Sequence, residues 1–345
     1  MERKKHPLIS AAVKAFLVAC CSLIGLFAGI FIIMIVFAGL SGSAAPGEVQ
    51  QVYTPKLLPN HEGKRKVEAA NSPIILRLDV TGIIGMESMN RETVIQQLVE
   101  SREGIFKSKR VKGIILYINT PGGSIVDMEG IYNAIDAYVK QYKIPVYGFV
   151  DGFCLSAGMY IVSVTDKIYS SDVSLIGSVG VLLPTFMNYS DTLEKLGIKT
   201  VTVTAGKEKD LMNPLRPWKE GEEQPLKEIT GYYYDRFLDL LAEKRPLLTK
   251  ERLRNEIGAG FFPAEKAKAY GFIDETGASF SSVLKDMIDE LGIEDHKYQV
   301  YTMERKYHLS DFFAGSLDLF QGKMTHRIEF GASFDQALFQ SAVGS

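Results

Sequence analysis

From Ala15 to Leu40 this chain has 26 consecutive residues without Asp, Glu, Lys or Arg, nearly all of them apolar. About 20 helical residues are enough to cross the hydrocarbon core of a bilayer, whereas the apolar region of a cleavable signal sequence holds roughly 7–15. The sequence therefore predicts one transmembrane anchor, residues 15–40, that stays on the chain. The rest must fold outside the lipid.

The residues on either side of this stretch predict its orientation. Four basic residues precede it: Arg3, Lys4, Lys5 and Lys14. Because basic residues stay on the cytoplasmic side, residues 1–14 are expected in the cytoplasm and everything after Leu40 outside it. Residues 41–72 are polar and contain three prolines, so they are expected to be a flexible linker. A folded domain is expected at 73–295, followed by an extension, 296–345, without a clean period.

Composition excludes several classes of protein. With 46% hydrophobic and 23% charged residues the chain can bury a sizeable core, and its net charge of -2 provides no basic field for nucleic acid. Two of the three cysteines, Cys20 and Cys21, lie in the apolar stretch, so no disulfide framework is expected. No closely spaced His and Cys ligands occur, and neither a metal nor another cofactor is predicted.

After the linker, short strand-like runs alternate with longer helical ones. Residues 73–80, 113–119 and 146–150 are short runs rich in β-branched residues, whereas 91–103 and 128–142 place apolar residues on one helical face. This alternation predicts an α/β fold with a parallel sheet, whose sites lie at the carboxyl ends of the strands.

One serine lies at such a strand end. Ser156 comes between the expected strand at 146–150 and a helix at 156–164. The free amides and the dipole of a helix N-terminus favour a developing negative charge, so an acyl-transfer nucleophile suits this position. The alternative is an ordinary serine that caps the helix.

A glycine pair lies at the end of another strand. Gly122 and Gly123 separate the run at 113–119 from the next helix, and glycines let backbone amides approach a ligand closely. They are suited to hold a substrate carbonyl, or else form a plain turn in which Ser124 caps the helix. A phosphate loop is disfavoured because no Gly-Lys-Ser/Thr follows them.

A serine nucleophile needs a base, and two lysines are candidates. Lys207 and Lys209 follow an alternating run, 199–204, that predicts a strand. Burial lowers the pKa of a lysine toward the value that a general base needs, and spacing alone does not choose between the two. The alternative is that both are solvated lysines on a surface loop. Histidine is disfavoured as the base because all five histidines lie outside the expected α/β core, at positions 6, 61, 296, 308 and 326.

Four ordered segments resemble the bacterial signal peptide peptidase A family, also called protease IV, in its short single-domain form. They are Asn119-Thr-Pro-Gly-Gly-Ser124, Leu155-Ser-Ala-Gly-Met-Tyr160, Ile176-Gly-Ser-Val-Gly-Val181 and Gly206-Lys-Glu-Lys-Asp210. The resemblance implies a Clp protease/crotonase-like spiral of β-β-α units, preceded here by one transmembrane helix. It also implies a homo-oligomer whose sites face an enclosed chamber.

The resemblance also implies roles for particular residues. It makes Ser156 the nucleophile and Lys209 the base, with Lys207 as the second choice. Ser178 would orient the lysine, and the amides of Gly122 or Gly123 and of Ala157 would hold the oxyanion. The family usually has glycine after the nucleophile and often alanine before it, where this chain has Ala157 and Leu155. Alanine would be strained if that position required a positive φ.

The expected function is therefore that of a serine endopeptidase of the bacterial inner membrane that hydrolyses remnant signal peptides outside the cytoplasm. Its partners would be these and other envelope polypeptides, together with the bilayer. One alternative is a membrane-anchored scaffold of the same fold with impaired catalysis. Another is an acyl-CoA enzyme of the crotonase type, which the exported location disfavours.

Overall fold

The computed structural model describes residues 7–40, 53–293 and 297–305, which belong to two separate units, 1–51 and 52–345. The first unit contains one helix, α1 (Pro7–Leu40). Its residues Phe16–Ile33 have a mean hydropathy of 2.7, and none of this window is buried. The helix is long and apolar enough to cross a membrane. Linker residues 41–52 lie outside the described part of the chain.

The second unit is built on a mixed sheet. In order along the sheet its strands are β1 (Tyr53–Leu58), β8 (Gln299–Arg305), β2 (Ile74–Thr81), β3 (Val111–Thr120), β4 (Val146–Leu155), β6 (Leu175–Gly177) and β7 (Phe261–Pro263), while β5 (Lys167–Ser170) pairs with β4 off this path. The central strands β2, β3 and β4 are parallel, as the sequence predicts. Their apolar side chains are buried because helices cover both faces of the sheet.

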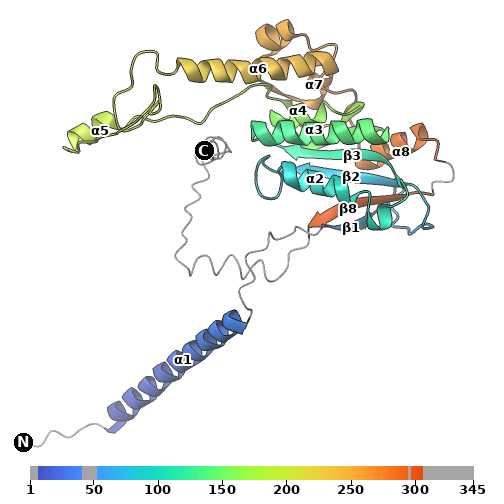
Figure 1. The fold of residues 1–345 in the computed structure, drawn as a ribbon. Helices are drawn as coiled ribbons and strands as arrows, with labels where there is room; N and C mark the ends of the chain where they lie inside the picture. The colour runs from blue at the N-terminus through green and yellow to red at the C-terminus, as the bar shows by residue number, and fades with distance from the viewer. Residues whose placement is uncertain (1–6, 41–52, 294–296, 306–345) are drawn as a thin grey trace, which may run out of the picture. The chain divides into compact units, whose positions relative to one another are not determined.

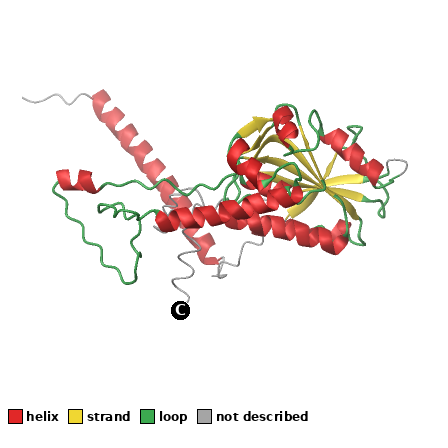
Figure 2. Ribbon diagram, turned by 90° about the horizontal axis from the view of Figure 1, so that it is seen from above, coloured by secondary structure: helices red, strands yellow, loops and turns green. Residues whose placement is uncertain are grey.

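Alternation along each strand divides the core into two. Leu76 of β2 packs in the larger core, which includes Ile131 of α3 (Ile125–Tyr142), while its neighbour Ile75 packs in the smaller core with Met287 of α8 (Phe280–Glu290). The larger core also receives α2 (Arg91–Glu100), α4 (Ala157–Val162) and α6 (Gln224–Lys244). Figure 1 and Figure 2 show the sheet enclosed between helices. The predicted α/β class is confirmed.

Several short helical elements complete the domain. A short 3-10 turn, η1 (Gly104–Phe106), comes after α2. A π-helical turn, η2 (Arg252–Ile257), and α7 (Ala264–Tyr270) follow α6. The helix α7 ends at Gly271, whose φ of +98° is a left-handed conformation that suits glycine.

Two predicted boundaries of the folded domain are wrong. Residues 53–58, assigned to the flexible linker, form β1, and 299–305, assigned to the extension, form β8. The two strands pair antiparallel, with Tyr53 opposite Arg305 and Leu58 opposite Val300. The two strands stabilise each other although they lie at opposite ends of the domain sequence. The rest of the extension, 306–345, lies outside the described residues.

A long segment between β6 and α6, residues 181–223, extends away from the sheet (Figure 1). It contains one short helix, α5 (Ser190–Lys195). We call it the projecting segment. The strand predicted at 199–204 is absent, and all six residues are exposed. An alternating run becomes a strand only beside a partner strand, and the described residues provide none there.

Candidate active site

The turn from β4 into α4 holds Ser156 in an unusual backbone conformation. Its φ is 51° and its ψ is -117°, a combination that costs a residue with a Cβ about 1–3 kcal/mol. The turn is fixed because the Ser156 amide donates to the Gly177 carbonyl of β6 at 2.9 Å. The serine side chain makes no capping hydrogen bond to α4. The capping alternative is therefore wrong, and the hydroxyl lies on a strained backbone at a helix N-terminus.

Ala157 begins α4 and is buried. Its φ is not positive, because Ser156 adopts the positive φ instead. The strain expected at this alanine therefore does not arise. As the first residue of the helix, Ala157 presents an amide that no carbonyl of α4 can accept.

The glycine pair lies against this turn. A Cβ built on Gly122 would come within 2.8 Å of the Ser156 Cβ and 3.3 Å of the Ala157 nitrogen. The Gly122 amide already donates to Thr120 Oγ1 at 3.1 Å. Gly123 forms a parallel bridge with Ile84, in which the bonds to Ile84 are made by the two neighbours of Gly123. The Gly122 carbonyl accepts from the Ile84 amide, and the Ser124 amide donates to the Ile84 carbonyl. The Gly123 amide therefore points away from Ile84. Of the two glycines, Gly123 has the available amide.

Ser124 does cap the helix that follows. Its hydroxyl accepts from the Asp127 amide at 3.2 Å, at the start of α3. The loop thus has two functions at once. Ser124 fixes the helix, and the glycines before it bring backbone close to Ser156.

Ser178 follows β6 and also has a positive φ, 54°. Its amide donates to the Gly260 carbonyl beside β7 at 2.7 Å. Ser178 lines the same pocket as Ser156, Ala157 and Gly123. The structure thus brings together every predicted site residue except the lysine. Gly122 does not line the pocket but packs against Ser156.

The pocket has a volume of about 470 Å³ and mostly apolar walls. Ile125 and Met128 of α3 and Phe237 of α6 line it together with Tyr160 of α4. The Tyr160 ring contacts the Phe237 ring at a centroid distance of 5.4 Å. Burial, and then the nearby negative charge of Glu129, raise the pKa of the Tyr160 hydroxyl.

Glu129 and Arg236, an ion pair at this pocket, were not found from the sequence. They lie on α3 and α6, far apart along the chain, and neither belongs to a recognisable motif. Only the packing of these two helices around Ser156 brings them together.

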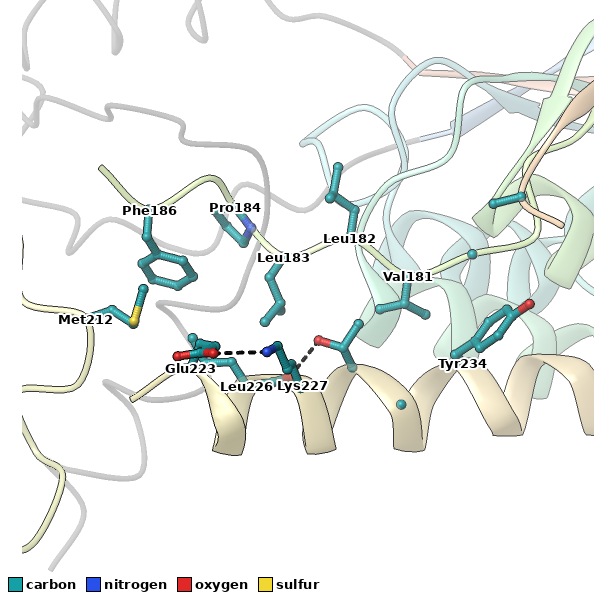
Figure 3. Close-up of a pocket in the computed structure, with 14 residues that line it drawn as sticks. Val181, Leu182, Leu183, Pro184, Phe186, Met212, Glu223, Leu226, Lys227 and Tyr234 are labelled. Atoms are coloured by element: carbon teal, nitrogen blue, oxygen red, sulfur yellow. Dashed lines mark hydrogen bonds and ion pairs between the residues drawn. The ribbon is translucent and has the colours of Figure 1, made fainter. Parts of the chain in front are cut away.

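A second hollow, of about 560 Å³, continues from the first along α6 (Figure 3). The two share four lining residues, Gly180, Val181, Leu182 and Ala259. Figure 3 shows Leu183 and Phe186 of the projecting segment above Leu226 of α6. The Lys227 amine donates to the Glu223 carboxylate at 2.9 Å along this helix.

Lys209 lies on the projecting segment and is exposed. It lines neither hollow, and it forms no hydrogen bond or ion pair with any residue that the structure describes. Lys207 pairs with its neighbour Glu208 at 3.3 Å. A single chain therefore does not place either lysine beside Ser156, and the predicted burial of Lys209 is not seen in it.

The loop that bears Lys209 nevertheless has a defined shape. Arg216 donates to Asp210 Oδ2 at 2.6 Å and to Glu222 Oε2 at 3.0 Å. The hydrogen bonds that Glu222 accepts from Arg216, and then from the amides of Lys219 and Met212, lower its pKa to about 2. The Trp218 ring donates to the Asn213 carbonyl at 3.0 Å in the same loop.

Two family models match this chain. Peptidase family S49 matches residues 139–294 and Clp protease matches residues 66–171, and both ranges include Ser156. Together with the mixed sheet, they define a protease-family chain with a Clp protease-like fold, as predicted.

Two relatives agree with this class. A protein of Enterococcus faecium described as a signal peptide peptidase SppA is 30% identical over 254 residues, which is 71% of this chain and 70% of that protein. A protease of Methanocaldococcus jannaschii is 31% identical over 55% of this chain and 63% of its own length. Among solved structures, a ClpP1 variant from Listeria monocytogenes has a TM-score of 0.39 at 17% identity, over 60% of this chain and 94% of that one. The chain belongs to the signal peptide peptidase A family.

Proposed function

We propose that this chain is a membrane-anchored serine endopeptidase in which Ser156 forms an acyl-enzyme. One observation above all supports the proposal. Ser156 is strained, does not cap its helix, and lies beside the amides of Gly123 and Ala157 at an apolar pocket. Such strain persists where the surrounding structure enforces it, and it concentrates at functional sites.

The proposed reaction is acyl transfer to the serine. Ser156 Oγ attacks the peptide carbonyl carbon and passes its proton to the neutral amine of Lys209, while the oxyanion accepts from the amides of Gly123 and Ala157. The carbon–nitrogen bond then breaks as the lysine returns the proton to the leaving amine. Water hydrolyses the serine ester with the same base. Ser178, which shares the pocket, would orient the amine.

We place the lysine in a neighbouring copy of the chain. Within one chain Lys209 is exposed on the projecting segment, whose Val201 and Val203 are 88% and 91% exposed. Apolar side chains this open gain free energy when a second copy covers them. The same contact would bury Lys209 and bring its amine to Ser156, where a general base is needed.

The hollows favour apolar peptides as substrates. The pocket at Ser156 and the hollow beyond it form a mostly apolar path of the kind that suits an extended apolar segment. Remnant signal peptides have this character, and α1 would hold the domain where such peptides leave the bilayer. We propose that residues 1–14 face the cytoplasm and that the domain works on the outer face of the bacterial inner membrane.

Complementation between two inactive variants tests this function. Ser156→Ala and Lys209→Ala proteins, each in detergent, are dissociated, mixed and reassembled, and the cleavage of a fluorogenic peptide is measured. Each variant alone should lose at least about a thousandfold in kcat, because nucleophile and base act as a unit. The mixture should recover activity, since some sites combine an intact serine with an intact lysine from different copies.

Several results would count against the proposal. If the mixture stays as inactive as its components while both assemble normally, the serine and lysine do not come from different copies. If Lys207→Ala rather than Lys209→Ala abolishes turnover, the base is the other lysine. Full activity of Ser156→Ala would exclude the serine mechanism altogether. No turnover by the native oligomer, with Ser156→Ala behaving identically, would favour the scaffold role.

A further inference from the structure

The pocket beside Ser156 contains two charged side chains of opposite sign. Glu129 of α3 and Arg236 of α6 are the only charged residues among those that line it within the described chain. The Arg236 guanidinium donates to Glu129 Oε1, so the two charges meet across the pocket from different helices. The remaining walls are glycine, serine, proline and apolar or aromatic residues.

This ion pair remains accessible to a ligand. The side chains of Glu129 and Arg236 are 34% and 46% exposed. The Arg236 guanidinium also faces the hydroxyl of Tyr160 on α4, the helix that follows Ser156. The pair therefore lies where a substrate side chain would enter, and it is not buried behind the wall.

We propose that the Glu129–Arg236 pair determines the charge selectivity of this pocket for the substrate side chain next to the attacked carbonyl. The proposal rests on the peptidase function above. While the two residues are paired, their charges cancel, and the pocket accepts uncharged apolar side chains. A charged side chain would have to break the pair and leave one partner without its counter-ion, which is costly in a partly desolvated site.

Removing one partner should reverse the preference. Glu129→Gln keeps the shape of the side chain but leaves Arg236 unpaired, so the pocket should favour glutamate. Arg236→Gln leaves Glu129 unpaired, and the pocket should favour lysine. A charge-assisted hydrogen bond at a half-exposed site should change the preference about tenfold.

The test uses the full-length protein in detergent with peptide coumarin amides that differ only in the last residue, Leu, Gln, Glu or Lys. The kcat/KM for each charged peptide is divided by that for Leu. Glu129→Gln should raise the Glu:Leu ratio about tenfold and lower the Lys:Leu ratio, and Arg236→Gln should do the opposite. The double variant Glu129→Arg/Arg236→Glu should again prefer Leu.

A matched control removes a charge outside the pocket. Arg254 pairs with Asp235, the residue next to Arg236 in sequence, and neither lines the pocket. Arg254→Gln changes the net charge by the same amount as Arg236→Gln, and it should leave all peptide ratios unchanged. Equal shifts in both variants would overturn the proposal in favour of a long-range field.

Other outcomes also decide the matter. If Glu129→Gln and Arg236→Gln lower kcat/KM equally for all four peptides, the pair only holds α3 against α6 and the proposal is wrong. Binding of labelled forms of these peptides to Ser156→Ala proteins with the same pocket changes gives the ratios without turnover. If no protein cleaves any peptide, the peptidase function fails, while the binding ratios still support or refute the role of the pair.

Discussion

The strained backbone at Ser156 predicts that this position is more stable as glycine than as alanine. The φ of 51° and ψ of -117° cost alanine about 1–3 kcal/mol, which glycine avoids because it lacks a Cβ. Glycine in turn loses about 0.5–1 kcal/mol more conformational entropy on folding. The net gain of Ser156→Gly over Ser156→Ala is therefore about 0–2.5 kcal/mol.

Both variants lack the hydroxyl, so the comparison isolates the backbone. Urea unfolding followed by circular dichroism at 222 nm measures the difference, because the single tryptophan reports only its own loop. Each kcal/mol should also raise the Tm by about 2–4 °C. Ala157→Gly serves as the control, since a helical residue should instead lose about 1 kcal/mol. A Ser156→Gly protein that is less stable than Ser156→Ala would refute the strain.

Two further predictions concern the wall of the site and the lysine-bearing loop. Gly122→Ala places a Cβ 2.8 Å from the Ser156 Cβ at a φ of +107°, so kcat/KM should fall at least about a hundredfold. Arg216 holds the pKa of Glu222 at about 2, below its ordinary 4.5, so this carboxylate stabilises the loop fully above pH 4.5. That stabilisation is lost as the pH falls toward 2. Trp218 fluorescence should stay constant from pH 7 to about 4.5 and then change, and in Glu222→Gln it should already be altered at pH 7.

Each of these predictions has its control. Gly63→Ala adds a methyl group at a φ of +78° with no atom within 4 Å, so it should cost some stability but no activity. Similar activity losses in both glycine variants would mean that the contact with the serine is irrelevant. Glu223→Gln removes an exposed carboxylate beside the loop and should leave the tryptophan signal intact at pH 7. A wild-type signal that changes between pH 7 and 5 would rule out Glu222 as its cause.

The parallel sheet was predictable because its strands are buried on both faces. The runs at 73–80, 113–119 and 146–150 are continuous apolar segments between helical ones, and they became β2, β3 and β4. Ser156 and the glycines followed from the same logic, since strand ends meet at one edge of such a sheet. The strain at Ser156 was not predictable, because it arises from the contact with β6.

Pairing between distant segments was beyond the reach of the sequence pattern. The strand β1 contains Pro55 and lies in a polar stretch, and its partner β8 comes at the other end of the domain. The opposite error occurred at 199–204, where alternation predicted a strand that has no partner in a single chain. In both cases local pattern was a poor guide because a strand is stabilised by its neighbour. The same limit left the position of Lys209 undecided.

The pairing of Tyr53 with Arg305 brings the entry and the exit of the folded domain to one margin of the sheet. Four steps from strand to strand lead from β1 to β4, which at the usual spacing is roughly 19 Å. The chain leading from α1 is thus attached well away from the serine. That attachment can therefore be lengthened, shortened or exchanged, and further sequence can be appended beside it, without disturbing the turn that holds Ser156.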